Sequence, residues 1–153
     1  MQVLELKVPP PAVMLVTGAL MWIVARAFPA LGLVFPARDP VAVGLALAGA
    51  VTCLLGVVSF RRAGTTINPM KPESSSSLVM SGIYEWTRNP MYLGFLLVLL
   101  GWAIFLANVL SFLFLPAFVL YMNRFQIEPE ERALAARVGE AYAAYKARAR
   151  RWI

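Results

Sequence analysis

The sequence from residue 89 to residue 123 reads NPMYLGFLLVLLGWAIFLANVLSFLFLPAFVLYMN, and its 35 residues include no charged side chain. A helix needs about 20 apolar residues to cross a bilayer, so this run is too long for one span and suits two. Asn108 lies near its middle and is of a residue type that favours turns. We therefore expect a helical hairpin with membrane spans at about 90–107 and 109–125.

The remaining composition extends this pattern to the whole chain. Of the 153 residues, 60% are hydrophobic and 14% are charged, whereas soluble domains contain about 25% charged residues. Two further apolar runs predict spans at about 12–28 and 41–60, separated by a proline-containing connector. The first run lacks a small-residue cleavage site, so we expect a retained span. The expected fold class is all-α: a single domain, residues 1–153, forming an integral membrane bundle of four transmembrane helices.

The distribution of basic residues predicts the orientation of this bundle. The net charge is +6, and of the 14 Lys and Arg residues four lie within residues 61–88 and seven within residues 124–151. Basic segments next to membrane spans remain in the cytoplasm. We therefore expect both termini to be cytoplasmic, and we interpret the charge as a membrane signal rather than as a sign of nucleic-acid binding.

Residue types that are missing exclude several chemistries. The chain has no histidine and a single cysteine, Cys53. A zinc site and the Ser/His and Cys/His catalytic pairs all need residues that are absent here. We therefore expect no metal, and we interpret Cys53, which lies in an apolar span, as a small packing residue.

Two polar segments lie outside the spans. Residues 61–89 form a cytoplasmic loop that is long for a simple connection. Within it, the segment from Gly64 to Pro69 is either a structural turn or a substrate loop, and Ser74 to Ser77 are expected to be flexible. After residue 127, a Glu-Pro-Glu-Glu sequence is typical of a helix start. Apolar residues then recur every three or four positions, which predicts a C-terminal amphipathic cytoplasmic helix at 129–150.

A hairpin at 90–125 brings two polar clusters to the same face of the membrane. The first is SGIYEWTRNPMYLG, residues 81–94, and the second is NRFQIEPEE, residues 123–131. Two interpretations remain open on these residues alone. Both clusters could line one pocket. Alternatively, the aromatic residues form a belt at headgroup depth, the acids compensate a helix end, and Arg124 is an ordinary interfacial anchor.

The spacing of these residues carries a resemblance. The pattern consists of Gly82, Tyr84, Arg88, Asn89-Pro90, Tyr92 and Gly94, followed by Arg124, Glu130-Glu131, Leu134, Gly139, Tyr142, Tyr145 and Arg151. It resembles the isoprenylcysteine carboxyl methyltransferase family, in particular its short bacterial members, and more distantly the phospholipid methyltransferases. The resemblance covers residues 61–153 and implies an enzyme of the bacterial inner membrane.

The resemblance implies S-adenosylmethionine as cofactor, bound at the cytoplasmic end of the hairpin. Glu130 or Glu131 would receive its ammonium group. The other implied cofactor-binding residues are Arg88, Asn89, Pro90, Tyr92, Leu93 and Gly94. The family often has His where this chain has Asn89, so any role of an imidazole at that position is absent. The lack of a Gly-rich G-x-G-x-x-G motif fits a binding mode without a Rossmann domain.

Methyl transfer from a sulfonium needs alignment and dehydration more than acid or base catalysis. The expected catalytic residues are Arg124 and Arg88, either of which could hold an anionic acceptor, and Tyr84, which could contact the sulfonium with Tyr92. We expect a lipid-like, membrane-embedded acceptor with a prenylcysteine-type carboxylate, and a lipid amine and a small thiol are the alternatives.

A non-enzymatic membrane module, such as a small transporter, is the competing interpretation. Transport routes are usually marked by ionisable residues within the spans, and apart from Arg124 at the end of the fourth span, these spans contain only Arg26, near one end. The expected partners are membrane lipids and the lipid-like or prenylated acceptor. The sequence leaves the oligomeric state open.

Overall fold

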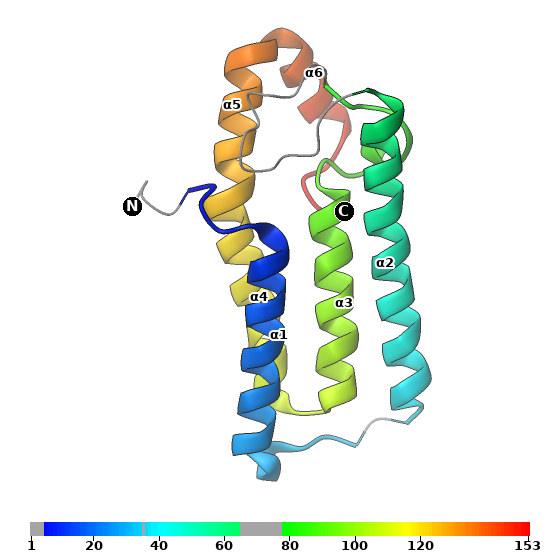
Figure 1. The fold of residues 1–153 in the computed structure, drawn as a ribbon, viewed down its shortest axis with the longest axis vertical. Helices are drawn as coiled ribbons and strands as arrows, with labels where there is room; N and C mark the ends of the chain where they lie inside the picture. Colours follow the sequence, from blue (N-terminus) through cyan, green and yellow to red (C-terminus); the bar gives the residue numbers. More distant parts are fainter. Residues whose placement is uncertain (1–4, 35, 65–77) are drawn as a thin grey trace.

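The computed structural model describes residues 5–34, 36–64 and 78–153, and their secondary structure is helical. Helices run along one axis in a bundle, and two shorter helices cover one end of it (Figure 1). We call this end, which comprises residues 81–89 and 123–153, the crown. In chain order the helices are α1 (Pro10–Ala27), η2 (Pro29–Leu31), α2 (Arg38–Arg62), η4 (Gly82–Glu85), α3 (Pro90–Leu106), α4 (Val109–Met122), η5 (Asn123–Ile127), α5 (Glu128–Val138) and α6 (Glu140–Arg148).

Three of these helical segments are long and apolar enough to cross a membrane: α1 with 18 residues, α2 with 25, and the continuous segment Val109–Val138 with 30. Leucines on α1 and α2 face outward; Leu15 is 66% exposed and Leu47 62%. An apolar surface of this kind suits lipid, and the chain is an integral membrane protein. The shorter helix α3 is apolar but has 17 residues, about 26 Å of helix. A fourth crossing by α3 therefore stays a prediction.

The hairpin turn predicted at Asn108 is confirmed, because α3 ends at Leu106 and α4 begins at Val109. The Asn108 side chain accepts a hydrogen bond from the backbone N–H of Leu110 at 3.0 Å and so caps α4. Its amide nitrogen donates to the Phe28 carbonyl at 2.9 Å. With 2% of its surface exposed, Asn108 joins the hairpin to the end of α1.

Small residues allow α2 and α3 to pack closely. A Cβ atom added to Gly94 on α3 would lie 2.6 Å from the Gly49 carbonyl oxygen and 2.4 Å from the Cys53 Sγ atom. The Gly49 carbonyl belongs to the backbone of α2, so a larger residue at Gly94 would force the two helices apart. Cys53 therefore lies in the helix contact, where its thiol also reaches the Met91 carbonyl at 3.4 Å.

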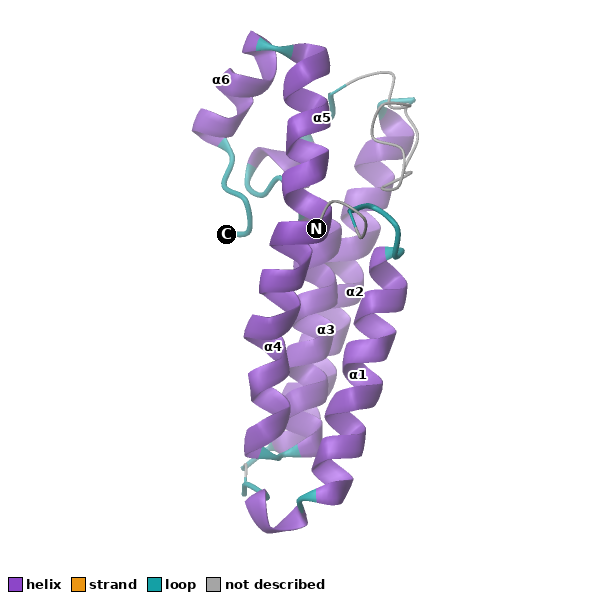
Figure 2. Cartoon of the chain, turned by 90° about the vertical axis from the view of Figure 1, so that its left-hand side faces the viewer, coloured by secondary structure: helices purple, strands orange, loops and turns teal. Residues whose placement is uncertain are grey.

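The predicted single helix at 129–150 is wrong and is corrected to two helices, α5 and α6. Gly139 separates them with φ +59°, a conformation that costs glycine little. Figure 2 shows α6 turning back beside α5. Tyr142 and Tyr145 are 3% and 4% exposed and pack with Leu134. The apolar stripe is thus buried within the crown, because the turn at Gly139 lets α6 fold back onto α5.

The described N-terminal residues also contact the crown. The backbone N–H of Leu6 donates to the Phe125 carbonyl at 3.0 Å. The buried side chain of Gln126, in the π-helical turn η5, donates to the Val8 carbonyl at 2.6 Å. A π-helical turn within a longer helix is frequent near functional sites. Apart from Gly64, the loop segment 64–69 and the serines at 74–77 lie outside the described residues.

Candidate functional site

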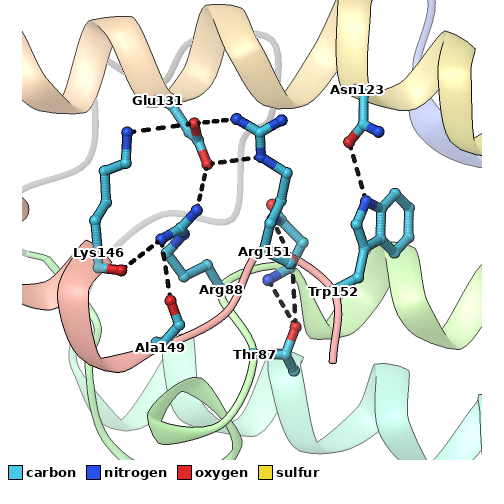
Figure 3. Close-up of polar contacts among 9 residues, drawn as sticks. Thr87, Arg88, Asn123, Glu131, Lys146, Ala149, Arg151 and Trp152 are labelled. Atoms are coloured by element: carbon cyan, nitrogen blue, oxygen red, sulfur yellow. Dashed lines mark hydrogen bonds and ion pairs between the residues drawn. The ribbon is translucent and has the colours of Figure 1, made fainter.

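The two polar sequence clusters meet in the crown, as Figure 3 shows. The guanidinium of Arg88, just before α3, donates from Nη2 to Glu131 Oε1 on α5 at 3.0 Å. The Arg88 side chain is 9% exposed and that of Glu131 is 11% exposed. Arg88 Nη1 donates to the carbonyls of Lys146 and Ala149 at 3.1 and 3.0 Å. This ion pair is shielded from solvent and connects the segment just before α3 with α5, the helix that follows α4 and η5.

The carboxylate of Glu131 is fully engaged. Besides the hydrogen bond from Arg88, its Oε1 accepts one from Arg151 Nε at 3.2 Å, and its Oε2 accepts one from Arg151 Nη2 at 2.8 Å. Lys146 Nζ lies 3.8 Å from Oε2. A carboxylate offers about four lone-pair positions, and three cations surround this one. The hydrogen bonds that Arg151 donates to Glu131 raise the pKa of the Arg151 guanidinium, which therefore stays protonated.

The neighbouring Glu130 has a different environment. Its Oε1 accepts a hydrogen bond from the Tyr92 hydroxyl at 2.5 Å, and within the described residues this is its one hydrogen bond. Tyr92 itself is 4% exposed. Of the two adjacent acids, Glu130 is thus the one whose carboxylate retains acceptor positions for a ligand.

One nitrogen of Arg88 has no hydrogen-bond partner within the described residues. This atom, Nε, is buried, although both terminal nitrogens are paired. An unpaired buried N–H costs free energy. The Nε atom therefore indicates where an acceptor group of a ligand would fit.

Two aromatic residues of the first cluster do not form the belt at headgroup depth that one interpretation of the sequence predicted. Tyr84 and Tyr92 are 5% and 4% exposed, and only Trp86, at 79%, projects outward. The Tyr84 carbonyl accepts from the Tyr145 hydroxyl at 2.7 Å, and its ring packs edge-on against Phe60. Burial raises the pKa of Tyr84, and it raises that of Tyr145 to about 12, so both phenols are neutral.

The other residues expected at the site separate into two groups. Asn89 belongs to the crown network, since its side-chain amide donates to the Arg151 carbonyl at 2.9 Å. Pro90 starts α3, Leu93 donates from its backbone N–H to the Asn89 carbonyl, and Gly94 serves the packing against α2. These three residues shape the first turn of α3 rather than presenting polar side chains.

Arg124 lies apart from the Glu131 network. Its guanidinium pairs with Glu5 at 3.2 Å and with Glu128 at 3.5 Å, and its side chain is 43% exposed. Glu5 also pairs with Arg132. The structure thus brings Arg88, Asn89 and Glu131 together and gives Arg124 other partners.

Sequence reasoning missed the residues that follow α6. The Trp152 indole donates to Asn123 Oδ1 at 3.0 Å, and Thr87 pairs with Arg150 in an isolated parallel bridge. Figure 3 shows the contact of Trp152 with Asn123 beside the Glu131 network. Their signal in the sequence was Arg151 at the end of the recognised pattern, together with the aromatic residue after it.

Comparisons with known proteins bear on this site. The model of the phospholipid methyltransferase family matches residues 38–141, more than half of the chain. The chain is 37% identical over 79 residues to the protein-S-isoprenylcysteine O-methyltransferase of Saccharomyces cerevisiae, covering 50% of this chain and 32% of that protein. It is 33% identical over 112 residues to the enzyme of the same name from Xenopus laevis, covering 67% and 38%.

A shorter relative comes from Haemophilus influenzae. It is 44% identical over 63 residues, which is 41% of this chain and its own entire length, and its name is simply uncharacterized protein. The chain spans only about a third of the length of the two named enzymes.

Proposed function

The chain belongs to the phospholipid methyltransferase family, and from this premise we propose that it transfers a methyl group from S-adenosylmethionine to a lipid-like acceptor at the crown. The observation that carries the proposal is that two polar groups there have free hydrogen-bonding capacity. One is the Nε of Arg88, which has no partner in the described part of the chain, and the other is the Glu130 carboxylate, which has a single partner there.

These groups fit the amino-acid end of the cofactor. An ammonium group needs a carboxylate with free acceptor positions, and a carboxylate needs a cationic donor. Glu130 would hold the ammonium, since the three hydrogen bonds and the Lys146 ion pair of Glu131 leave it little capacity. Arg88 Nε would hold the carboxylate. When bound, the cofactor supplies a methyl group already activated on sulfur.

The groups of the chain would then bind, orient and exclude water. An ionised acceptor carboxylate needs no general base, which suits a chain without histidine. Buried Tyr92, held by Glu130, would offer a ring face to a sulfonium. Tyr84 would support the same region through its packing on Phe60 and its contact with Tyr145.

A groove in the bundle supports an acceptor with an apolar part. It has a volume of about 680 Å³ and lies among α1, α2 and α3. Its lining extends from Met14, in the second turn of α1, to Phe105, near the end of α3. We assign the lipid chain of the acceptor to this groove. We further propose four spans with both termini on the cytoplasmic side, since both ends of the described chain contact the crown.

The head of the acceptor is proposed to be a carboxylate, because the relatives named above are O-methyltransferases of isoprenylcysteine. Arg124 would bind it and would have to exchange Glu5 or Glu128 for it. The family name, phospholipid methyltransferase, supports a lipid amine as the second candidate.

A methyl-transfer assay tests the proposal. Detergent-purified protein would be given labelled S-adenosylmethionine with a prenylcysteine analogue, an aminophospholipid or a small hydrophobic thiol. We expect the prenylcysteine carboxylate to be methylated, and Arg124→Gln to reduce that rate about tenfold or more by removing a charged hydrogen bond. Methylation of the amine or thiol alone would refute the assignment of the acceptor, and no transfer to any of the three would count against the proposed activity.

A further inference from the structure

The five residues after α6 form a tail that runs across the start of α3. Its backbone pairs with the preceding segment, because the Arg88 N–H donates to the Arg150 carbonyl at 2.8 Å and the Arg150 N–H donates to the Trp86 carbonyl at 3.3 Å. The Arg151 carbonyl accepts from the Asn89 side chain. On one side the tail therefore lies along residues 86–89 and is held there by hydrogen bonds.

On its other side the tail contacts the end of the α4 segment. Arg151 binds Glu131 on α5 through two hydrogen bonds, and the Trp152 indole donates to Asn123 in η5. The Arg151 side chain is 34% exposed and its partner Glu131 11%. The side chains of the tail thus contact η5 and α5, whereas its backbone contacts residues 86–89. The tail therefore connects the two polar clusters of the site.

Arg88 depends on this region for most of its contacts. Its Nη1 donates to the Ala149 carbonyl, at the start of the tail, and to the Lys146 carbonyl in α6, and its own N–H binds Arg150. With these groups fixed, Nε is the one nitrogen of the side chain that has no hydrogen-bond partner among the described residues. The region matched by the family model ends at residue 141, so the tail lies outside it.

We propose that residues 149–152 are a positioning element of the cofactor site, with Arg151 and Trp152 as the anchors that act through Arg88. The inference rests on the proposed function, because the group that Arg88 presents is assigned there to the cofactor carboxylate. Anchoring of the tail fixes the guanidinium before the ligand arrives, which lowers the ordering cost of binding.

Asn89 receives a defined role in this arrangement. Its side chain acts as an N–H donor to the tail, a task that a histidine ring N–H can also perform. Asn89→His is therefore expected to preserve the tail and cofactor binding, whereas Asn89→Asp replaces the donor with an acceptor and repels the Arg151 carbonyl.

The test compares Arg151→Gln and Trp152→Phe with Arg150→Ala. The control removes the same charge from the same tail but keeps the Arg150 backbone, whose hydrogen bonds to Arg88 and Trp86 belong to the positioning element. The Arg150 side chain is exposed, and among the described residues it reaches only the Ile153 carbonyl, at 3.5 Å. S-adenosylhomocysteine is titrated by calorimetry. Backbone hydrogen exchange at Arg88 and Arg150 is measured without ligand, and thermal unfolding verifies that each variant is folded.

We expect Arg151→Gln to weaken S-adenosylhomocysteine binding about tenfold or more and to speed exchange at Arg88, as the loss of a charged hydrogen-bonded pair implies. Trp152→Phe should change both in the same direction, and Arg150→Ala neither. Unchanged affinity or unchanged exchange in folded Arg151→Gln would overturn the inference. Wild-type protein that binds no S-adenosylhomocysteine would overturn the proposed function and with it the cofactor role of the tail.

Discussion

Replacement of Glu131 by alanine is expected to destabilise the crown, because it leaves Arg88 without its counter-ion. The Arg88 side chain is 9% exposed, and removal of one partner of a buried ion pair costs about 3–5 kcal/mol. Arg88 keeps its two hydrogen bonds to the Lys146 and Ala149 carbonyls, which favours the lower end of that range. Arg151 and Lys146 are 34% and 45% exposed, so their lost contacts add at most about 1 kcal/mol each.

Two further substitutions separate the effect of the buried Glu131 charge from that of the side-chain shape and from that of an exposed ion pair. Glu131→Gln keeps an acceptor for Arg88 and loses the charge, so we expect a smaller loss of about 1–3 kcal/mol. Asp39→Ala breaks the ion pair of Arg38 with Asp39, whose side chains are 45% and 68% exposed. This control should cost less than about 1 kcal/mol.

The measurement is reversible unfolding in mixed micelles, followed by circular dichroism, for wild type and each variant. An Arg88→Ala and Glu131→Ala cycle would add the coupling energy of the pair, expected at about 1–3 kcal/mol. If Glu131→Ala were no more destabilising than Asp39→Ala, the ion pair would not hold the two halves of the site together.

Two predictions concern the scaffold beneath the site. Gly94→Ala should separate α2 from α3, because its Cβ would meet Cys53 Sγ and the Gly49 carbonyl, and unfolding should show a loss of about 1–3 kcal/mol; wild-type stability would contradict the close contact. Asn108→Ala removes the cap of α4 and the bond to Phe28 and should cost about 1–2 kcal/mol. A change below half that value in the same unfolding measurement would show that the hairpin turn does not depend on Asn108.

Features that depend on neighbouring residues could be predicted from the sequence. The turn at Asn108 follows from an uncharged run that is too long for one helix, and the structure places the turn there. The convergence of Arg88 with Glu131 followed from the same hairpin. The break at Gly139 did not, because apolar spacing continues through it and only the packing of Tyr142 and Tyr145 shows that the chain turns.

Contacts between distant residues decided the remaining details. The sequence places Arg88 and Glu131 near one ligand, but the structure pairs them with each other and brings Arg151 and Lys146 to the same carboxylate. The sequence likewise assigns Arg124 to the acceptor. Its pairing with Glu5, 119 positions away along the chain, could not be read from local spacing.

The central claim is that the crown binds S-adenosylmethionine through Glu130, and titration of S-adenosylhomocysteine into detergent-purified protein tests it most directly. Wild type should bind saturably, and Glu130→Gln should bind about tenfold more weakly or worse, because a charged hydrogen bond to the ammonium is lost. Its unfolding should match that of wild type, since Tyr92 can still donate to the amide oxygen. Absence of saturable binding by wild type, or equal affinity in folded Glu130→Gln, would contradict the claim.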